Sequence, residues 1–118
     1  MQINNVLASL PLKDLAVSRA WYEKLFGRTP DSSPMPTLAE WRFAGGGSLQ
    51  VYAGPDRAGN GSCTLAVSNI EAAIDGLEKL GIDPGRLIDG GKAKVVMVKD
   101  PDGNSIAFAQ AMDASLAH

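Results

Sequence analysis

The sequence predicts an α+β fold, with two tandem βαβββ modules that form a curved mixed sheet around a cleft and carry their helices on the outer face. Two observations predict this fold: an internal repeat aligns the two halves of the chain, and strand-like and helix-like periodicities follow the same order in each half. At 118 residues the chain has the length of one ordinary domain. We therefore expect a single domain over residues 1–118, with module one at about 1–56 and module two at about 57–118.

The internal repeat becomes visible when the sequence is shifted against itself. At an offset of 55 residues, LPLKDLAVSRAWYEKL (10–25) aligns with LAVSNIEAAIDGLEKL (65–80), and both segments end in EKL. At an offset of 57 residues, GGSLQVYA (46–53) aligns with GNSIAFAQ (103–110). Each half is too short to be stable alone, so the repeat indicates a duplicated supersecondary unit.

Module one begins with a strand and a helix. Period-two alternation predicts the strand at Val6–Leu12. Asp14 follows at the N-cap position, where a short side-chain oxygen can accept a hydrogen bond from an unpaired amide of the first turn. Apolar residues at helical spacing predict a helix over Leu15–Phe26, and Gly27 is a natural end for it.

Three strands are expected in the remainder of module one. A short strand is expected within Thr29–Pro36, and longer ones at Ala39–Ala44 and Ser48–Ala53. Gly45–Gly47 joins the two longer strands as a hairpin turn, because glycine adopts the positive φ that such turns require.

Module two repeats this order. Its expected elements are, in chain order, the strand Ser62–Val67, the helix Ile70–Leu80, a short strand near Gly85–Ile88, and the strands Ala93–Lys99 and Ser105–Gln110. Asn69 is the expected N-cap of the helix, and Gly81 is its expected end. DPDGN (100–104) is the expected hairpin turn, in which Asp100 and Asp102 cap backbone amides.

Composition and rare residues exclude several classes of function. Lys plus Arg is 11 and Asp plus Glu is 13, so the net charge of −2 leaves no basic surplus for nucleic acid. Cys63 is the single cysteine, which excludes an internal disulfide and fits a reducing compartment. His118 is the single histidine, so we expect no histidine-bearing catalytic triad, no Cys/His zinc site and no two-histidine metal centre.

The sequence also gives no indication of a membrane partner. No apolar run approaches the roughly 18 residues that a membrane-spanning helix needs. The first residues, MQINNVLASLPL, lack the basic region of a signal peptide. We therefore expect a soluble cytoplasmic protein.

Alternation within the strands separates two faces of the sheet. One face is uniformly apolar and is expected to lie under the amphipathic helices. The other face carries small or weakly polar residues and is expected to line a ligand-binding cleft. The expected ligand contacts on this face are Leu7, Ser9, Gln50, Tyr52, Ser62, Thr64, Ala107 and Ala109. A solvated sheet face or a dimer surface is the alternative interpretation of the same pattern.

The strand at 39–44 allows two orientations. If Trp41 and Phe43 face the helices, Glu40 and Arg42 face the cleft, and Arg42 can hold an anionic ligand. If the orientation is reversed, Trp41 becomes an aromatic platform for a flat ligand. A third interpretation is an ion pair between Glu40 and Arg42 at a sheet edge.

The repeat and two of its segments resemble one known superfamily. LPLKDLAVSRAWYEKLFG (10–27) and KDPDGNSIAF (99–108), together with the duplication, resemble the vicinal oxygen chelate superfamily. This superfamily includes glyoxalase I, bleomycin resistance proteins and extradiol dioxygenases, and the resemblance covers nearly the whole chain. It implies a homodimer whose clefts are partly shared between the two chains.

The resemblance also implies where a metal ion would be bound. The metal-dependent members place His, Gln or Glu ligands on the first, fourth, fifth and eighth strands. These positions correspond to Leu7, Gln50, Ser62 and Ala107, of which only Gln50 could ligate a metal. A divalent cation needs about three or four good ligands, so we expect no metal and no cofactor.

The sequence thus predicts a metal-independent small-molecule binding protein, with no catalytic residues. The alternative is a lyase, isomerase or dioxygenase of the same superfamily, with an atypical or absent metal site. A third hypothesis is a scaffold that serves mainly for dimerisation or for contact with a partner.

Overall fold

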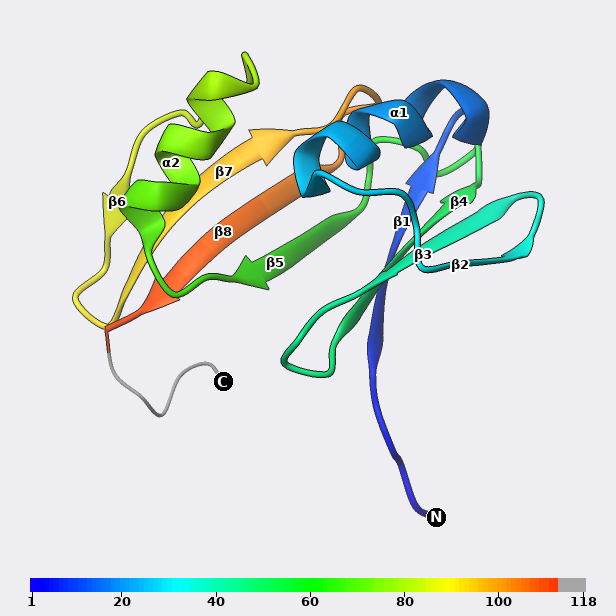
Figure 1. Cartoon of the computed structure of the whole chain (residues 1–118), viewed down its shortest axis with the longest axis horizontal. Helices are drawn as coiled ribbons and strands as arrows, with labels where there is room; N and C mark the ends of the chain where they lie inside the picture. Colours follow the sequence, from blue (N-terminus) through cyan, green and yellow to red (C-terminus); the bar gives the residue numbers. More distant parts are fainter. Residues whose placement is uncertain (113–118) are drawn as a thin grey trace. The chain divides into compact units, whose positions relative to one another are not determined.

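The computed structural model describes residues 1–112 of the chain and contains two βαβββ modules (Figure 1). In chain order the elements are β1 (Leu7–Leu12), α1 (Leu15–Phe26), β2 (Ser32–Met35), β3 (Leu38–Arg42), β4 (Ser48–Ala53), β5 (Ser62–Ala66), α2 (Ile70–Lys79), β6 (Ile88–Asp89), β7 (Ala93–Lys99) and β8 (Ser105–Ala111). The same order of elements in both halves confirms the duplication predicted from the sequence. His118 lies outside the described residues.

Each module forms its own mixed four-stranded sheet, whereas the sequence predicted one curved sheet for both modules. The strand orders are β1-β4-β3-β2 and β5-β8-β7-β6. In each sheet one pair is parallel, β1 with β4 and β5 with β8, and the other pairs are antiparallel. The first strand of each module is therefore an edge strand, hydrogen-bonded to the last strand of the same module.

The strand register repeats as well as the strand order. Leu7 lies opposite Ser48 in the first sheet, and Ser62 lies opposite Ser105 in the second. The offset of 55 carries Leu7 onto Ser62, and the offset of 57 carries Ser48 onto Ser105. The register derived from the sequence repeat is therefore the register of the two sheets.

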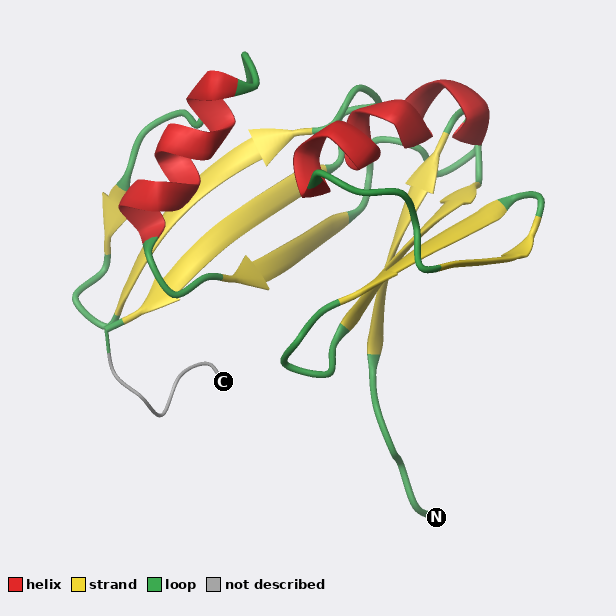
Figure 2. Cartoon of the chain, in the orientation of Figure 1, coloured by secondary structure: helices red, strands yellow, loops and turns green. Residues whose placement is uncertain are grey.

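The chain divides into two units, each with its own core. The first unit contains residues 1–61 and the loop 100–104, and the second contains residues 62–99 and, among the described residues, 105–112. α1 packs on β4, and α2 packs on β7 and β8 (Figure 2). The cores combine sheet residues with helix residues: Leu10, Leu12, Tyr22, Trp41, Leu49 and Val51 in the first unit, and Ile70, Leu77, Val96, Val98 and Ile106 in the second.

α1 begins and ends as the sequence predicts, and α2 begins at the predicted residue but ends at Lys79, one residue before the predicted end. The Asp14 side chain accepts hydrogen bonds from the amides of Ala16 and Val17, at 3.0 and 3.4 Å, and the Asn69 side chain accepts one from Ala72. Gly27 and Gly81 have φ of 71° and 75°, the left-handed conformation that ends a helix at little cost only for glycine. No helix within residues 1–112 is long and apolar enough to cross a membrane.

The loop between β7 and β8 belongs to the first unit, although β7 and β8 belong to the second. Asp100 Oδ1 accepts hydrogen bonds from the amides of Asp102 and Asn104, and Asp102 Oδ2 accepts one from the amide of Lys13. These contacts confirm that the two aspartates cap backbone amides. Tyr22 of α1 donates its hydroxyl proton to Asp100 Oδ2, so the loop is bonded to the helix of the first unit.

Candidate functional site

The helix-free face of the first sheet carries five of the predicted ligand contacts. Leu10, Leu12, Leu49 and Val51 are fully buried on the helix side, so the alternate residues of β1 and β4 face away from α1. These are Leu7 and Ser9, which are exposed, and Gln50 and Tyr52, which are half-buried. Arg42 of β3 is exposed on the same face.

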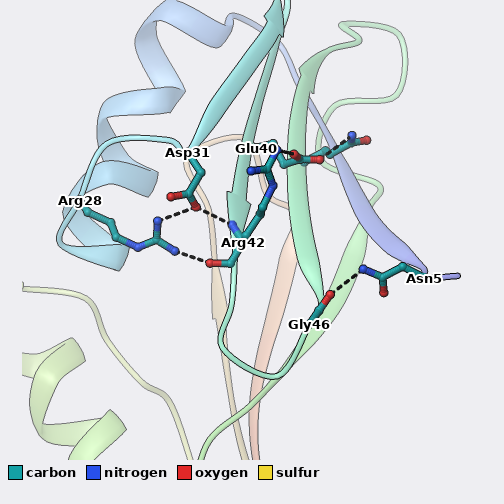
Figure 3. Close-up of polar contacts among 7 residues, drawn as sticks. Asn5, Arg28, Asp31, Glu40, Arg42 and Gly46 are labelled. Atoms are coloured by element: carbon teal, nitrogen blue, oxygen red, sulfur yellow. Dashed lines mark hydrogen bonds and ion pairs between the residues drawn. The ribbon is translucent and has the colours of Figure 1, made fainter.

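A row of polar side chains crosses three strands of this face. Ser9 Oγ donates to Gln50 Oε1 at 3.3 Å, and Gln50 Nε2 donates to Glu40 Oε1 at 3.2 Å. Arg42 Nη2 lies 3.3 Å from Glu40 Oε2, and Figure 3 shows this pair. Ser9, Gln50 and Glu40 are direct partners in the strand register. We call these four residues, Ser9, Gln50, Glu40 and Arg42, the polar row.

Glu40 is the centre of the polar row. Its carboxylate is almost buried, because the residue is only 7% exposed. A buried carboxylate is costly unless donors surround it, and here Gln50 and Arg42 supply them. The ends of the row remain accessible, since the Arg42 side chain is 62% exposed and Ser9 is exposed.

The backbone of Arg42 is held by a second set of contacts, drawn in Figure 3. Asp31 Oδ2 accepts hydrogen bonds from Arg28 Nη1 at 2.6 Å and from the Arg42 amide at 2.7 Å. Arg28 Nη2 donates to the Arg42 carbonyl at 2.6 Å. The hydrogen bond from the Arg28 side chain, followed by that from the Arg42 amide, holds the pKa of Asp31 below its ordinary value of 3.8. These contacts of Arg28 and Asp31 fix the end of β3 next to the polar row.

Trp41 lies on the opposite face and is fully buried. Its ring centroid is 6.1 Å from that of Tyr22 and 5.3 Å from that of Phe26, both on α1, and its Nε1 donates to the Arg28 carbonyl. The structure therefore selects the orientation in which Arg42 faces away from the helix. The idea that Trp41 forms an exposed platform is wrong, because its indole fills the helix–sheet core. The ion pair of Glu40 and Arg42 is present, but β3 lies inside the sheet and not at its edge.

Tyr52 lies beside the polar row. Its register partners are Pro11 of β1 and Leu38 of β3. The ring lies close to Gly54, since a Cβ at Gly54 would come within 2.7 Å of Tyr52 Cε2. The glycine thus leaves the space that the tyrosine ring occupies.

The helix-free face of the second sheet carries the other four predicted contacts. Ser62 and Thr64 are exposed on β5, while Ala107 is 7% exposed and Ala109 is half-buried on β8. In the register Ser62 pairs with Ser105, and Thr64 pairs with Ala107.

Two polar residues of this face, Lys99 and Ser105, escaped the sequence interpretation. They are direct partners, and Lys99 Nζ donates to Ser105 Oγ at 2.7 Å. The signal was present in the sequence. Val95, Met97 and Lys99 occupy every second position of β7, so their side chains lie on the same face of the sheet.

The four positions that the resemblance to the superfamily assigns to a metal, Leu7, Gln50, Ser62 and Ala107, offer few atoms that could ligate a divalent cation. Leu7 and Ala107 have no ligand atom in their side chains, and the Gln50 amide oxygen already accepts a hydrogen bond from Ser9. Within residues 1–112, no three or more His, Cys, Asp or Glu side chains come together in a way that could hold a metal.

Solved structures show clear similarity to this chain. A glyoxalase/bleomycin resistance protein from Catenulispora acidiphila is 30% identical, with a TM-score of 0.81 over 91% of this chain and 97% of that one. A bleomycin-binding protein in complex with bleomycin is 20% identical, with a TM-score of 0.73 over 92% and 98%. A lactoylglutathione lyase from Agrobacterium tumefaciens is 16% identical, with a TM-score of 0.74 over 91% and 92%. No protein-family model and no curated protein matches the sequence.

Proposed function

Because the chain belongs to the family of glyoxalase and bleomycin resistance proteins, we propose that it binds a small molecule without the help of a metal ion. The ligand contacts the helix-free face of the first sheet, and the polar row is the observation that carries the proposal. An almost buried carboxylate with two fixed donors is a costly arrangement for a surface that only faces water. Polar groups fixed on a largely apolar surface are typical of ligand sites.

Each member of the polar row has a role in this proposal. Gln50 bonds to Ser9 through its oxygen and to Glu40 through its nitrogen, so its amide is fixed in one orientation. The exposed ends, Ser9 and Arg42, offer a hydroxyl group and a guanidinium group to the ligand. Tyr52 and Leu7 supply aromatic and aliphatic surface beside these groups.

The residues at the positions that the superfamily resemblance assigns to a metal support metal independence. Two of the four have no donor atom, which leaves too few ligands for a tightly held divalent ion. Metal-assisted reactions rely on the ion as a Lewis acid, so we propose binding and not turnover. We also propose a homodimer in the cytoplasm. The superfamily resemblance supports the dimer, and the single cysteine fits the reducing compartment.

Bleomycin is the first probe, because it is the ligand named for one structural neighbour. Protein without a histidine tag is titrated with bleomycin while its melting temperature is recorded, alongside a panel of small aromatic and cationic compounds. A ligand at about 100 times its Kd stabilises the native state by about 2.7 kcal/mol, which raises Tm by several degrees. Gln50→Ala is expected to reduce this shift strongly, whereas Gln2→Ala, at an exposed glutamine, leaves it unchanged.

Three outcomes contradict the proposal. The first is an equal ligand-induced shift in the Gln50→Ala variant, and the second is no shift with bleomycin or with any compound of the panel. The third is a stoichiometric divalent ion in the purified protein, measured by elemental analysis, whose removal abolishes ligand binding. That third result would favour an enzyme with an atypical metal site.

A further inference from the structure

We propose that the helix-free face of the second sheet holds a binding site for an oxyanion, such as a phosphate or carboxylate group, formed by Lys99, Ser105 and Ser62. The inference rests on the second sheet alone and uses no residue of the polar row. It adds a charge class to the molecules that this protein recognises.

The three residues form one line across three neighbouring strands. Ser105 of β8 is the direct register partner of Ser62 on β5 and of Lys99 on β7. Adjacent strands lie about 4.8 Å apart, so the two hydroxyl groups and the ammonium group project from one side of the sheet within reach of a single small anion. Ser62 and Lys99 are exposed, and Ser105 is half-buried between them.

The ammonium group of Lys99 is held in place with donors to spare. Its Nζ donates to Ser105 Oγ at 2.7 Å. An ammonium group has three N–H donors, so two remain for a ligand. Because Ser105 Oγ accepts this bond, its own proton remains available to donate to a ligand.

Lys99 forms no ion pair with a carboxylate within the part of the chain that the structure describes. The ion pairs found among residues 1–112 join other residues, and none includes Lys99. The remaining residues of this face are uncharged: Ile88, Val95, Met97, Ala107, Ala109, Thr64 and Ala66. Lys99 is therefore the one charged group on the described part of this face.

This arrangement favours an anion over a cation or a neutral group. A single positive charge on a face of small and apolar residues is little screened by neighbouring charges, so it attracts an opposite charge. The adjacent hydroxyl groups supply directional donors, which an oxyanion uses and a simple halide uses less well. Thr64, exposed two residues after Ser62 on the same face, adds a further hydroxyl group.

The test is a titration of the full chain with inorganic phosphate, and in a second arm with acetate, at constant ionic strength. Backbone amide shifts are followed by NMR at Ser62, Thr64, Ser105 and Ala107. We expect saturable shifts at these residues, and the arm with the lower Kd identifies which oxyanion geometry the site prefers. Lys99→Met is expected to weaken binding at least tenfold, and Ser105→Ala is expected to weaken it several-fold.

The matched control is Lys94→Met, which removes the same charge from the same strand on its other face. It is expected to leave the Kd within twofold of the wild-type value. Shifts that do not saturate in either arm would overturn the inference. Equal losses in the Lys99→Met and Lys94→Met variants would also overturn it, because they would indicate general charge attraction. Failure here leaves the bleomycin titration and its Gln50→Ala variant unaffected, so the two proposals fail separately.

Discussion

Asp31 connects the end of α1 to β3 through charge and hydrogen bonding. Its carboxylate accepts from the Arg28 side chain and from the Arg42 amide, and these two contacts lower its pKa from the ordinary value of 3.8. A carboxyl group whose pKa is lower in the folded state than in the unfolded state stabilises the fold while it is ionised. That contribution is complete above the unfolded pKa, and it is lost as the pH falls through the lower, folded pKa.

We predict that the advantage of wild-type protein over Asp31→Asn depends on pH in this direction. The difference in unfolding free energy is expected to be constant above about pH 5 and to decrease as the pH falls below 3.8. Urea denaturation between pH 3 and pH 7 measures it. Asp56→Asn, at an exposed loop carboxylate, controls for the loss of one negative charge. A difference that grows on acidification would contradict the assignment.

Sequence reasoning at the residue scale identified side chains but not their partners. Gln50 and Arg42 were expected to contact a ligand. Alternation placed Gln50 on the face away from the helix, and it left the face of Arg42 open. That both bond to Glu40 could not be predicted, because β3 allowed two orientations and the strand register was unknown. Lys99 was missed, although the alternation of side chains along β7 places it on the face away from the helix.

Strand β3 shows how one element serves both faces of its sheet. Trp41 is fully buried against the aromatic rings of α1, while the next residue, Arg42, has a side chain that is 62% exposed. The two residues are neighbours in sequence, so their side chains point to opposite faces of the same strand, one into the core and one toward solvent.

We predict that alanine substitutions at these two neighbours differ sharply in cost. Trp41→Ala removes a buried aromatic side chain and is expected to destabilise the fold by about 3–5 kcal/mol. Arg42→Ala keeps the backbone contacts with Asp31 and Arg28 but removes one donor from the almost buried Glu40 carboxylate, so its cost is expected to be smaller, about 1–2 kcal/mol. Urea denaturation of both variants gives the comparison. Similar costs would mean that the orientation of β3 is assigned incorrectly.

Elements with strong periodicity were predicted well. Of the two short edge strands, β2 lies within the predicted range and β6 was placed less precisely. α1, β4 and β7 have the bounds that the sequence predicts, and α2 ends one residue earlier than expected. The sixth strand was expected near Gly85–Ile88 but is formed by Ile88–Asp89. A strand this short has no measurable periodicity, and its position depends on pairing with Val95 and Lys94 of β7.

At the scale of the whole molecule, the duplication is imperfect in one respect. The sequence repeat assigns DPDGN (100–104) to module two, yet this loop belongs to the first unit. Asn104 is fully buried there: its Oδ1 accepts hydrogen bonds from the amides of Gly59 and Gly61, and its Nδ2 donates to the Pro11 carbonyl. These contacts join residues more than 40 positions apart, and no local pattern in the sequence reports them.

Asn104→Ala is therefore predicted to affect the first sheet, although residue 104 lies between β7 and β8 in the sequence. The substitution leaves two part-buried N–H groups and the buried Pro11 carbonyl without their Asn104 partner, at about 1 kcal/mol or more each, so we expect a total loss of about 3 kcal/mol. Native-state hydrogen exchange is expected to accelerate more in β1 and β4 than in β7 and β8. Asn60→Ala, at the exposed asparagine between Gly59 and Gly61, is expected to leave hydrogen exchange in both sheets unchanged. Acceleration confined to β7 and β8 would show that the loop stabilises its own hairpin and not the first unit.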